Sequence, residues 1–134
     1  MTGAGVFCRA SRGALRDAGG VDTAFADRWI ALWNAHDVVG VCALFADEIV
    51  FRSHTAAVVV PESNGVIVGK AALEHYWHRA VERNESLQFE LVTAYSCLGN
   101  LMVICYRNQR HEDRVEVLRF AGVLVVEGWA GRSK

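Results

Sequence analysis

The sequence lacks several features, and each absence excludes a class of protein. Its apolar runs, such as residues 56–61, are far shorter than the ~20 residues that a membrane-spanning helix needs. Its net charge is -1 and its lysines and arginines form no cluster, whereas a nucleic-acid site needs a positive stripe for the phosphates. We therefore expect neither a membrane nor a nucleic acid among its partners.

Cysteine is scarce as well. The four cysteines, Cys8, Cys42, Cys97 and Cys105, contain no C-x-x-C pair and are too sparse for a disulfide scaffold. This usage is typical of reduced thiols in a cytoplasm, so we expect a cytoplasmic protein. No motif predicts a cofactor, and we expect none.

Apolar residues are plentiful by contrast. The chain has 134 residues, of which 52% are hydrophobic and only 22% charged. That length supports one core, and the apolar surplus suggests a lined cavity or a buried oligomer face besides. Residues 1–21 show no apolar periodicity, and their arginines interrupt any secretory signal. We therefore predict a flexible tail over residues 1–21 and a single domain over residues 22–134.

Helical spacing dominates the first half of this domain. Asp22 is a candidate N-cap for a first helix and Asp37 for a short second one, and Gly69 opens a third. The stripes predicted to be buried contain Phe25, Trp29, Leu32 and Trp33, then Val38, Val41, Cys42 and Phe45, then Leu73, Tyr76, Trp77 and Ala80. His75, His78 and Glu82 could in principle clip a metal, but an exposed helix face carries such sets by chance, and we expect no metal site.

Strand patterns account for the rest. Residues 49–54 alternate, with Val50, Arg52 and His54 on one face, and either face could meet a pocket. Residues 56–69 predict a strand or loop, a turn at 63–65 and a short return strand. The last third predicts strands at 87–96, 101–108, 113–120 and 123–129, with a hairpin turn at Gly99 and Asn100. The order indicates an α+β fold with helices on one face of a curved sheet.

The strand over residues 113–120 carries a pair of opposite charges. Arg114 and Glu116 share a face with Leu118 and Phe120, because alternate residues of a strand point the same way. Neither face is cleanly polar, so the pair either points into an enclosure, where the two charges would have to pair, or forms a solvated ion pair at an open strand end. The pattern leaves both interpretations open.

Four segments together resemble a known family. They are residues 29–37 (WIALWNAHD), 44–48 (LFADE), 69–77 (GKAALEHYW) and 116–120 (EVLRF), and they look like the nuclear transport factor 2-like superfamily, specifically its bacterial SnoaL-like branch. The resemblance covers about residues 22–130. It implies an α+β barrel in which a cone-shaped, curved antiparallel sheet is closed by three helices around a deep apolar pocket, often in a homodimer formed through the outer face of the sheet.

The resemblance also assigns positions within the pocket. Glu116 stands where ketosteroid isomerase has the acid that holds the oxyanion, while Trp29 and Ser53 replace that enzyme's tyrosine and base. Residues 113–116 are similar to the acid-arginine-valine-acid strand of limonene epoxide hydrolase. That enzyme's second acid falls near Arg132, and its tyrosine and asparagine fall at Phe51 and Ser53, so three of its five roles are not carried over.

These observations lead to two hypotheses. The first is an acid-base enzyme of isomerase, epoxide hydrolase or cyclase type, with Glu116 as proton carrier, Arg114 holding its charge, and His54 or Tyr106 as the second group. The second is a non-catalytic, dimeric ligand-binding or assembly module in which Arg114 and Glu116 are a structural pair. In both, the partner is a small apolar molecule. The side chains expected to contact it are Trp29, Trp33, Phe51, Tyr76, Trp77, Tyr106, Leu118 and Trp129.

Overall fold

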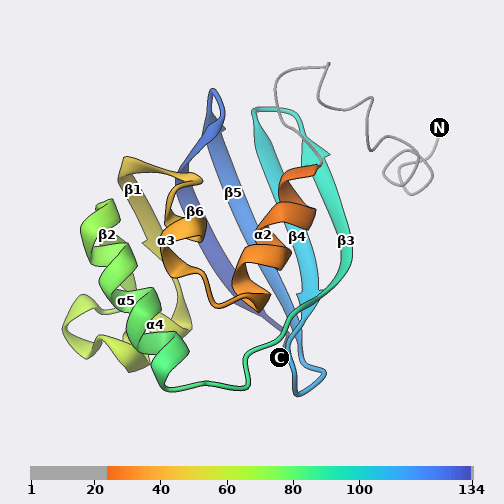
Figure 1. The fold of residues 1–134 in the computed structure, drawn as a ribbon. Coiled ribbons are helices and arrows are strands. Elements are labelled where there is room, and N and C mark those ends of the chain that lie inside the picture. Colours follow the sequence, from red (N-terminus) through yellow and green to blue (C-terminus); the bar gives the residue numbers. More distant parts are fainter. Residues whose placement is uncertain (1–23, 134) are drawn as a thin grey trace.

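The computed structural model describes residues 24–133. The predicted tail over residues 1–21, with Cys8, and the predicted cap at Asp22 lie outside the described residues. The described part forms two layers, a sheet and a set of helices packed on it (Figure 1).

The sheet has six strands in the order β2-β1-β6-β5-β4-β3. The strands are β1 (Phe45–Arg52), β2 (Val66–Val68), β3 (Glu90–Cys97), β4 (Leu101–Arg107), β5 (Asp113–Ala121) and β6 (Leu124–Arg132). Neighbouring strands run antiparallel except β1 and β6, which are parallel. The predicted α+β fold is therefore confirmed, but the sheet is mixed rather than wholly antiparallel, and its two edges do not close on each other.

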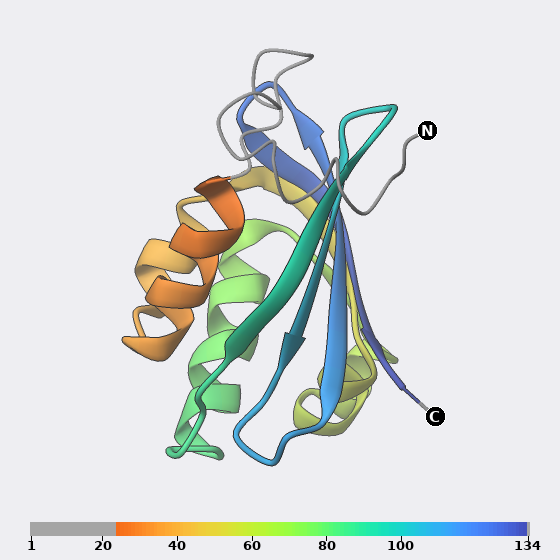
Figure 2. The ribbon, with the colours of Figure 1, turned by 90° about the vertical axis from the view of Figure 1, so that its right-hand side faces the viewer.

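In the described part of the chain four α-helices, one more than predicted, accompany the sheet. They are α2 (Ala24–Asn34), α3 (Val38–Cys42), α4 (His54–Val59) and α5 (Lys70–Glu82), and a short 3₁₀ turn, η2 (Pro61–Ser63), follows α4. Figure 2 shows α2, α3 and α5 on one side of the sheet, which leaves its other face uncovered by these helices. No helix in the described part is long and apolar enough to cross a membrane.

Helix α4 occupies a segment that was predicted to be a strand or loop. The Ser53 hydroxyl accepts hydrogen bonds from the backbone N–H groups of Thr55 and Ala56, so Ser53 caps a new helix where β1 ends. The β1 alternation therefore stops before His54, and the prediction of a strand through that residue was wrong.

The predicted turns are confirmed, and so are the helix stripes except at Phe45. The second helix was predicted to bury Phe45, but α3 ends at Cys42 and Phe45 is the first residue of β1. Asn64 and Gly65 have φ of 54° and 87°, and Gly99 and Asn100 have φ of 94° and 61°, the left-handed values that tight turns require. In α5 the stripe of Leu73, Tyr76 and Trp77 is buried, as are Trp29 and Trp33 in α2.

Aromatic rings join the helix layer to the inner face of the sheet. Trp33 of α2 meets Trp77 of α5 edge-to-face at 5.0 Å between ring centroids, and Trp29 meets Tyr106 of β4 at 5.2 Å. Such edge-to-face pairs add to the area that the rings bury. The aromatic core therefore sits where the helices cross β4, and it forms one wall of the cavity described next.

Candidate functional site

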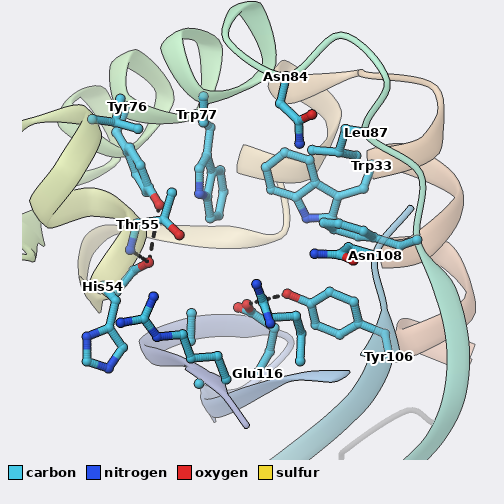
Figure 3. A pocket seen from close by; sticks show the side chains of 18 of the residues that line it. Trp33, His54, Thr55, Tyr76, Trp77, Asn84, Leu87, Tyr106, Asn108 and Glu116 are labelled. Carbon is cyan, nitrogen blue, oxygen red and sulfur yellow. Dashed lines mark hydrogen bonds between the residues drawn. The ribbon is translucent and has the colours of Figure 1, made fainter. Parts of the chain in front are cut away.

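A cavity of about 350 Å³ lies between the helices and the inner face of the sheet. Six of the eight predicted ligand contacts line it: Trp29, Trp33, Phe51, Tyr76, Trp77 and Tyr106. Figure 3 shows Tyr76, Trp77 and Trp33 on the helix side and Tyr106 and Glu116 on the strand side. A volume of this size is at the lower end of the range for small-molecule sites.

Glu116 is the carboxyl group of this cavity. It lies on the inner face of β5, is only 5% exposed, and accepts a hydrogen bond of 3.2 Å from the hydroxyl of Tyr106 on β4. Burial raises the pKa of Glu116 from 4.5 to about 8, and the hydrogen bond from Tyr106 opposes that shift. The side chain is therefore poised to gain or lose a proton close to neutral pH.

Two tyrosine hydroxyls belong to the same cavity. Burial, and then the neighbouring Glu116 carboxyl, raise the pKa of Tyr106 well above its ordinary value, so Tyr106 keeps its proton and remains a donor. The hydroxyl of Tyr76 lies 3.3 Å from that of Ser53, and burial raises the pKa of Tyr76 to about 12. Both tyrosines are thus neutral hydrogen-bonding groups at neutral pH.

The predicted ion pair between Arg114 and Glu116 does not form. Arg114 lines the cavity, but its guanidinium contacts Oε1 of Glu112 at 2.8 Å and the backbone oxygen of Asp113 at 3.1 Å. The two residues do share the inner face, as expected from the alternation. Arg114 nevertheless forms its ion pair with Glu112, which precedes the strand, and Glu116 accepts a hydrogen bond from Tyr106 instead.

His54 lines the cavity from a different position than predicted. It is the first residue of α4 and is exposed at the rim. Within the described residues His54 makes no hydrogen bond or ion pair with Glu116, whereas Tyr106 donates a hydrogen bond to it, so the structure joins Glu116 with Tyr106 and not with His54.

Two predicted ligand contacts lie elsewhere. Leu118 is fully buried in the core and does not line the cavity. Trp129 of β6 is paired across the strands with Val117, which places it on the outer face of the sheet, where the Arg52 guanidinium lies 4.8 Å from its ring. Both predictions were wrong. Leu118 shares the inner face with Glu116 but is covered within the core, and the register between β5 and β6 puts Ala130, not Trp129, beside Glu116.

Sequence reasoning missed most of the polar lining. Two asparagines line the cavity, Asn84 after α5 and Asn108 after β4. Three arginines line it as well: Arg83 directly after α5, Arg110 in the turn between β4 and β5, and Arg132 at the end of β6. They come together only because the C-terminal end of α5, the turn between β4 and β5 and the end of β6 meet at one end of the cavity. The only sequence signal for them was their position at element boundaries, where functional side chains concentrate.

His75, His78 and Glu82 on α5 do not form a metal-binding group within the described structure. Nε2 of His78 lies 3.6 Å from Glu74, one turn away, and no group of three or more metal-ligating side chains occurs within residues 24–133.

Comparison with known proteins decides the family. The sequence profile of the SnoaL-like domain matches residues 26–132. The chain belongs to the SnoaL-like family. This match confirms the resemblance drawn from the four sequence segments. No curated protein sequence matches the chain.

Solved structures agree with the SnoaL-like assignment. A SnoaL-like protein of unknown function from Burkholderia thailandensis is 27% identical, with a TM-score of 0.76 over 82% of this chain and 92% of that one. A hypothetical protein with a ketosteroid isomerase-like fold from Catenulispora acidiphila, in complex with trimethylamine, is 16% identical, with a TM-score of 0.64 over 80% and 83%. An NTF-2 like protein of unknown function from Burkholderia xenovorans is 18% identical, with a TM-score of 0.62 over 81% and 79%.

The last two structures are similar to this SnoaL-like chain in fold alone. The fold is compatible with a protein that binds a small molecule, but a fold does not select a reaction. The reaction, if there is one, therefore depends on Glu116 and its surroundings.

Proposed function

We propose that this SnoaL-like protein is an acid-base enzyme of isomerase, epoxide hydrolase or cyclase type, acting on a small, largely apolar molecule. One observation carries the proposal: a buried carboxyl, Glu116, whose pKa is raised to about 8, opens into a cavity of about 350 Å³. A general acid or base works best when its pKa lies near the working pH. Strongly perturbed groups in a cavity also occur preferentially at functional sites.

Glu116 carries the proton in this proposal. At neutral pH a group with a pKa of about 8 is mostly protonated, so it delivers a proton to the substrate and takes one back in a later step. The hydrogen bond from Tyr106 stabilises the carboxylate that remains after delivery, because a donated hydrogen bond favours the charged form.

The second group is Tyr106 rather than His54. Tyr106 touches Glu116, is almost fully buried and keeps its proton. While Glu116 is protonated, the single O–H of Tyr106 can turn to a substrate oxygen, and it donates to Glu116 once the carboxylate forms. Because His54 is exposed at the rim, it is better placed to contact the part of a ligand that faces solvent.

The proposal is tested by turnover. The purified protein is screened against epoxides, ketosteroids and aromatic polyketides, and Glu116→Gln is then assayed on any substrate that is converted. We expect the substitution to reduce kcat by at least about a hundredfold, the usual scale for a general acid or base. Glu90→Gln, which changes an exposed carboxyl outside the cavity, is the matched control and should keep full activity. Full activity of the Glu116→Gln variant would remove Glu116 from the mechanism.

A non-catalytic ligand-binding or assembly module is the second candidate. The observation in its favour is that, within residues 24–133, the only hydrogen bond made by the Glu116 carboxyl goes to Tyr106 within the same sheet, an arrangement that also serves as a structural pair. Tight binding of a ligand without conversion of any substrate would favour this alternative.

We also propose a homodimer formed through the outer face of the sheet. Apolar side chains from β4 and β5 lie on that face, among them Leu101, Val103, Val115 and Val117, and α2, α3 and α5 all cover the opposite face. An apolar sheet face of this kind is typical of a surface that is buried against a partner.

We propose a cytoplasmic location as well, since Cys42, Cys97 and Cys105 are free thiols.

A further inference from the structure

The cavity carries far more positive charge than the chain as a whole. Among the described residues that line it, four are arginines and Glu116 is the only one with a carboxyl group, whereas the whole chain has a net charge of -1. Arg114 and Arg132 come from neighbouring strands, Arg83 from the end of α5 and Arg110 from the turn between β4 and β5. The charge is thus concentrated at one end of the cavity.

Two of these arginines are placed directly against each other. Arg114 and Arg132 are register partners on β5 and β6 and share the cavity-facing side with Glu116, since Glu116 is in turn paired with Ala130. Like charges opposite each other on one sheet face are unfavourable. An anion placed between them would relieve that repulsion.

The protein itself supplies little compensating charge. Glu112 contacts Arg114 at 2.8 Å and Arg110 at 3.4 Å, so one carboxylate serves two arginines. Arg83 and Arg132 make no ion pair with any residue between 24 and 133. The guanidinium groups of Arg83 and Arg132 therefore remain available to a ligand, and Arg114, the register partner of Arg132, shares its one carboxylate with Arg110.

Deeper in the cavity, two indole N–H groups lack acceptors. Trp29 and Trp33 are 1% and 5% exposed and line the cavity, and within the described residues their Nε1 atoms have no hydrogen-bond partner. In Figure 3 the Trp33 ring nitrogen faces the space above Tyr106 and Glu116. Buried donors without acceptors are costly, so a ligand oxygen that reached either N–H group would be stabilised there.

From these two features together we infer that the cavity binds an amphiphilic anion. Its apolar ring body, carrying a carbonyl or hydroxyl oxygen, lies among the tryptophans, and its acidic group, a carboxylate, sulfonate or phosphate, lies at the arginine end between Arg114 and Arg132. Guanidinium groups suit such oxyanions because they offer paired donors in a planar fork. The inference names the ligand class for the cavity of the proposed function and rests on that cavity being a ligand site.

A pair of dyes that differ in one charged group tests the inference without any turnover. The dyes are 1-anilinonaphthalene-8-sulfonate and its neutral counterpart N-phenyl-1-naphthylamine, and binding is measured by fluorescence titration at low and high salt. We expect the wild type to bind the sulfonate about tenfold more tightly at low salt, with the preference falling as salt screens the arginines. Indole N–H signals in nitrogen-15 spectra locate the dye: those of Trp29 and Trp33 should shift, and that of Trp129, on the outer face, should not.

Substitutions assign the preference to the two register partners. The double variant Arg114→Gln with Arg132→Gln should bind both dyes about equally, and the corresponding double lysine variant should keep most of the preference for the sulfonate. Arg79→Gln is the matched control, because Arg79 lies one turn before Arg83 on α5 but does not line the cavity. Thermal unfolding of each variant confirms that it is folded.

The possible failures are distinguishable. Equal binding of both dyes by the wild type, or an equal loss in Arg79→Gln, would overturn the charged ligand class while leaving the proposed proton chemistry of Glu116 intact. Failure of both dyes to shift the Trp29 and Trp33 signals would overturn the ligand cavity itself, and with it both proposals. Loss of turnover in Glu116→Gln with an unchanged dye preference would support the two proposals separately.

Discussion

The hydroxyl of Tyr106 on β4 donates a hydrogen bond to Oε2 of Glu116 on β5, 3.2 Å away and buried beneath the helices. The two residues are diagonal neighbours, since Tyr106 is paired with Arg114 and Glu116 with Ile104. Burial disfavours the carboxylate and the hydrogen bond favours it, and the pKa of about 8 is the balance of these opposing effects. Less burial should lower the pKa of Glu116, and loss of the hydrogen bond from Tyr106 should raise it.

The first prediction concerns pH and stability. In the unfolded chain Glu116 titrates near its ordinary pKa of 4.5, and in the folded chain near 8, so between these values the folded state binds more protons. The free energy of unfolding should therefore fall as pH rises from about 4.5 to 8, by on the order of a few kcal/mol, and level off above that range. Urea unfolding across this range measures the slope.

Glu116→Gln provides the comparison for this slope. Glutamine does not titrate and can still accept the hydrogen bond from Tyr106, and Arg114 is paired with Glu112, so no partner is left uncompensated. The variant should lose most of the slope and be more stable than the wild type at pH 8. Glu90→Gln should retain the wild-type slope, and an unchanged slope in Glu116→Gln would show that another group causes it.

The second prediction concerns the hydroxyl of Tyr106. Tyr106→Phe removes the hydrogen bond that lowers the pKa of Glu116, so that pKa should rise further and the pH profile of kcat should move to higher pH. Stability should fall by about 1 kcal/mol, the usual contribution of one hydrogen bond.

The hydroxyl of Tyr76 provides the matched control. It lies beside the hydroxyl of Ser53 and makes no hydrogen bond to Glu116. Tyr76→Phe should therefore lower stability by a similar amount without an equal shift of the profile. Identical profiles for the two variants would show that the contact between Tyr106 and Glu116 does not set the pKa.

The third prediction concerns assembly. Sedimentation should give a dimer at micromolar concentration, since stable interfaces of this kind bury on the order of 1,200–2,000 Å². Val103→Lys places a charge in the middle of the outer face of β4 and should give a monomer that still folds. Val39→Lys, on α3 where Val39 is already 60% exposed, should remain dimeric. A monomeric wild type would contradict the proposed interface.

The fourth prediction concerns the packing of β6 against β1. A Cβ atom at Gly128 would lie 2.7 Å from Cδ1 of Phe51 and 3.2 Å from Cδ2 of Leu118. Gly128→Ala should therefore destabilise the fold by about 1–3 kcal/mol, the range for overpacking a core. Adding Phe51→Leu should recover part of that loss, and a double-mutant cycle by urea unfolding measures the coupling. Purely additive losses would contradict a direct clash.

Much of the fold was predictable because its signals are local. The stripe of Leu73, Tyr76 and Trp77 and the turn at Gly99 and Asn100 depend on spacing and turn chemistry within a few residues. The start of α4 was missed because Ser53 ends a strand and caps a helix at once, and alternation alone does not reveal a cap.

The site was less predictable because it depends on register between distant segments. Glu116 was found from its own strand, but Trp129 was assigned to the wrong face, since one residue of register decides which side chain of β6 stands beside it. The pairing of β5 with β6 shifts between Arg119 and Phe120, and a single strand pattern does not show such a bulge. The partner of Arg114 was also hidden, because Glu112 lies before the strand and outside its alternation.

The parallel pairing of β1 with β6 has a consequence for how the chain is made. Arg52 and Glu127 are 75 residues apart in the chain, and their side chains are 3.1 Å apart in space. The edge of β1 that faces β6 therefore stays unpaired until β6 has been synthesised. Long-range pairing of this kind slows folding and leaves apolar strand faces exposed in the meantime. Since β1 contributes Phe51 to the cavity and β6 contributes Ala130, we expect the cavity to form only after β6 has been synthesised and has paired with β1.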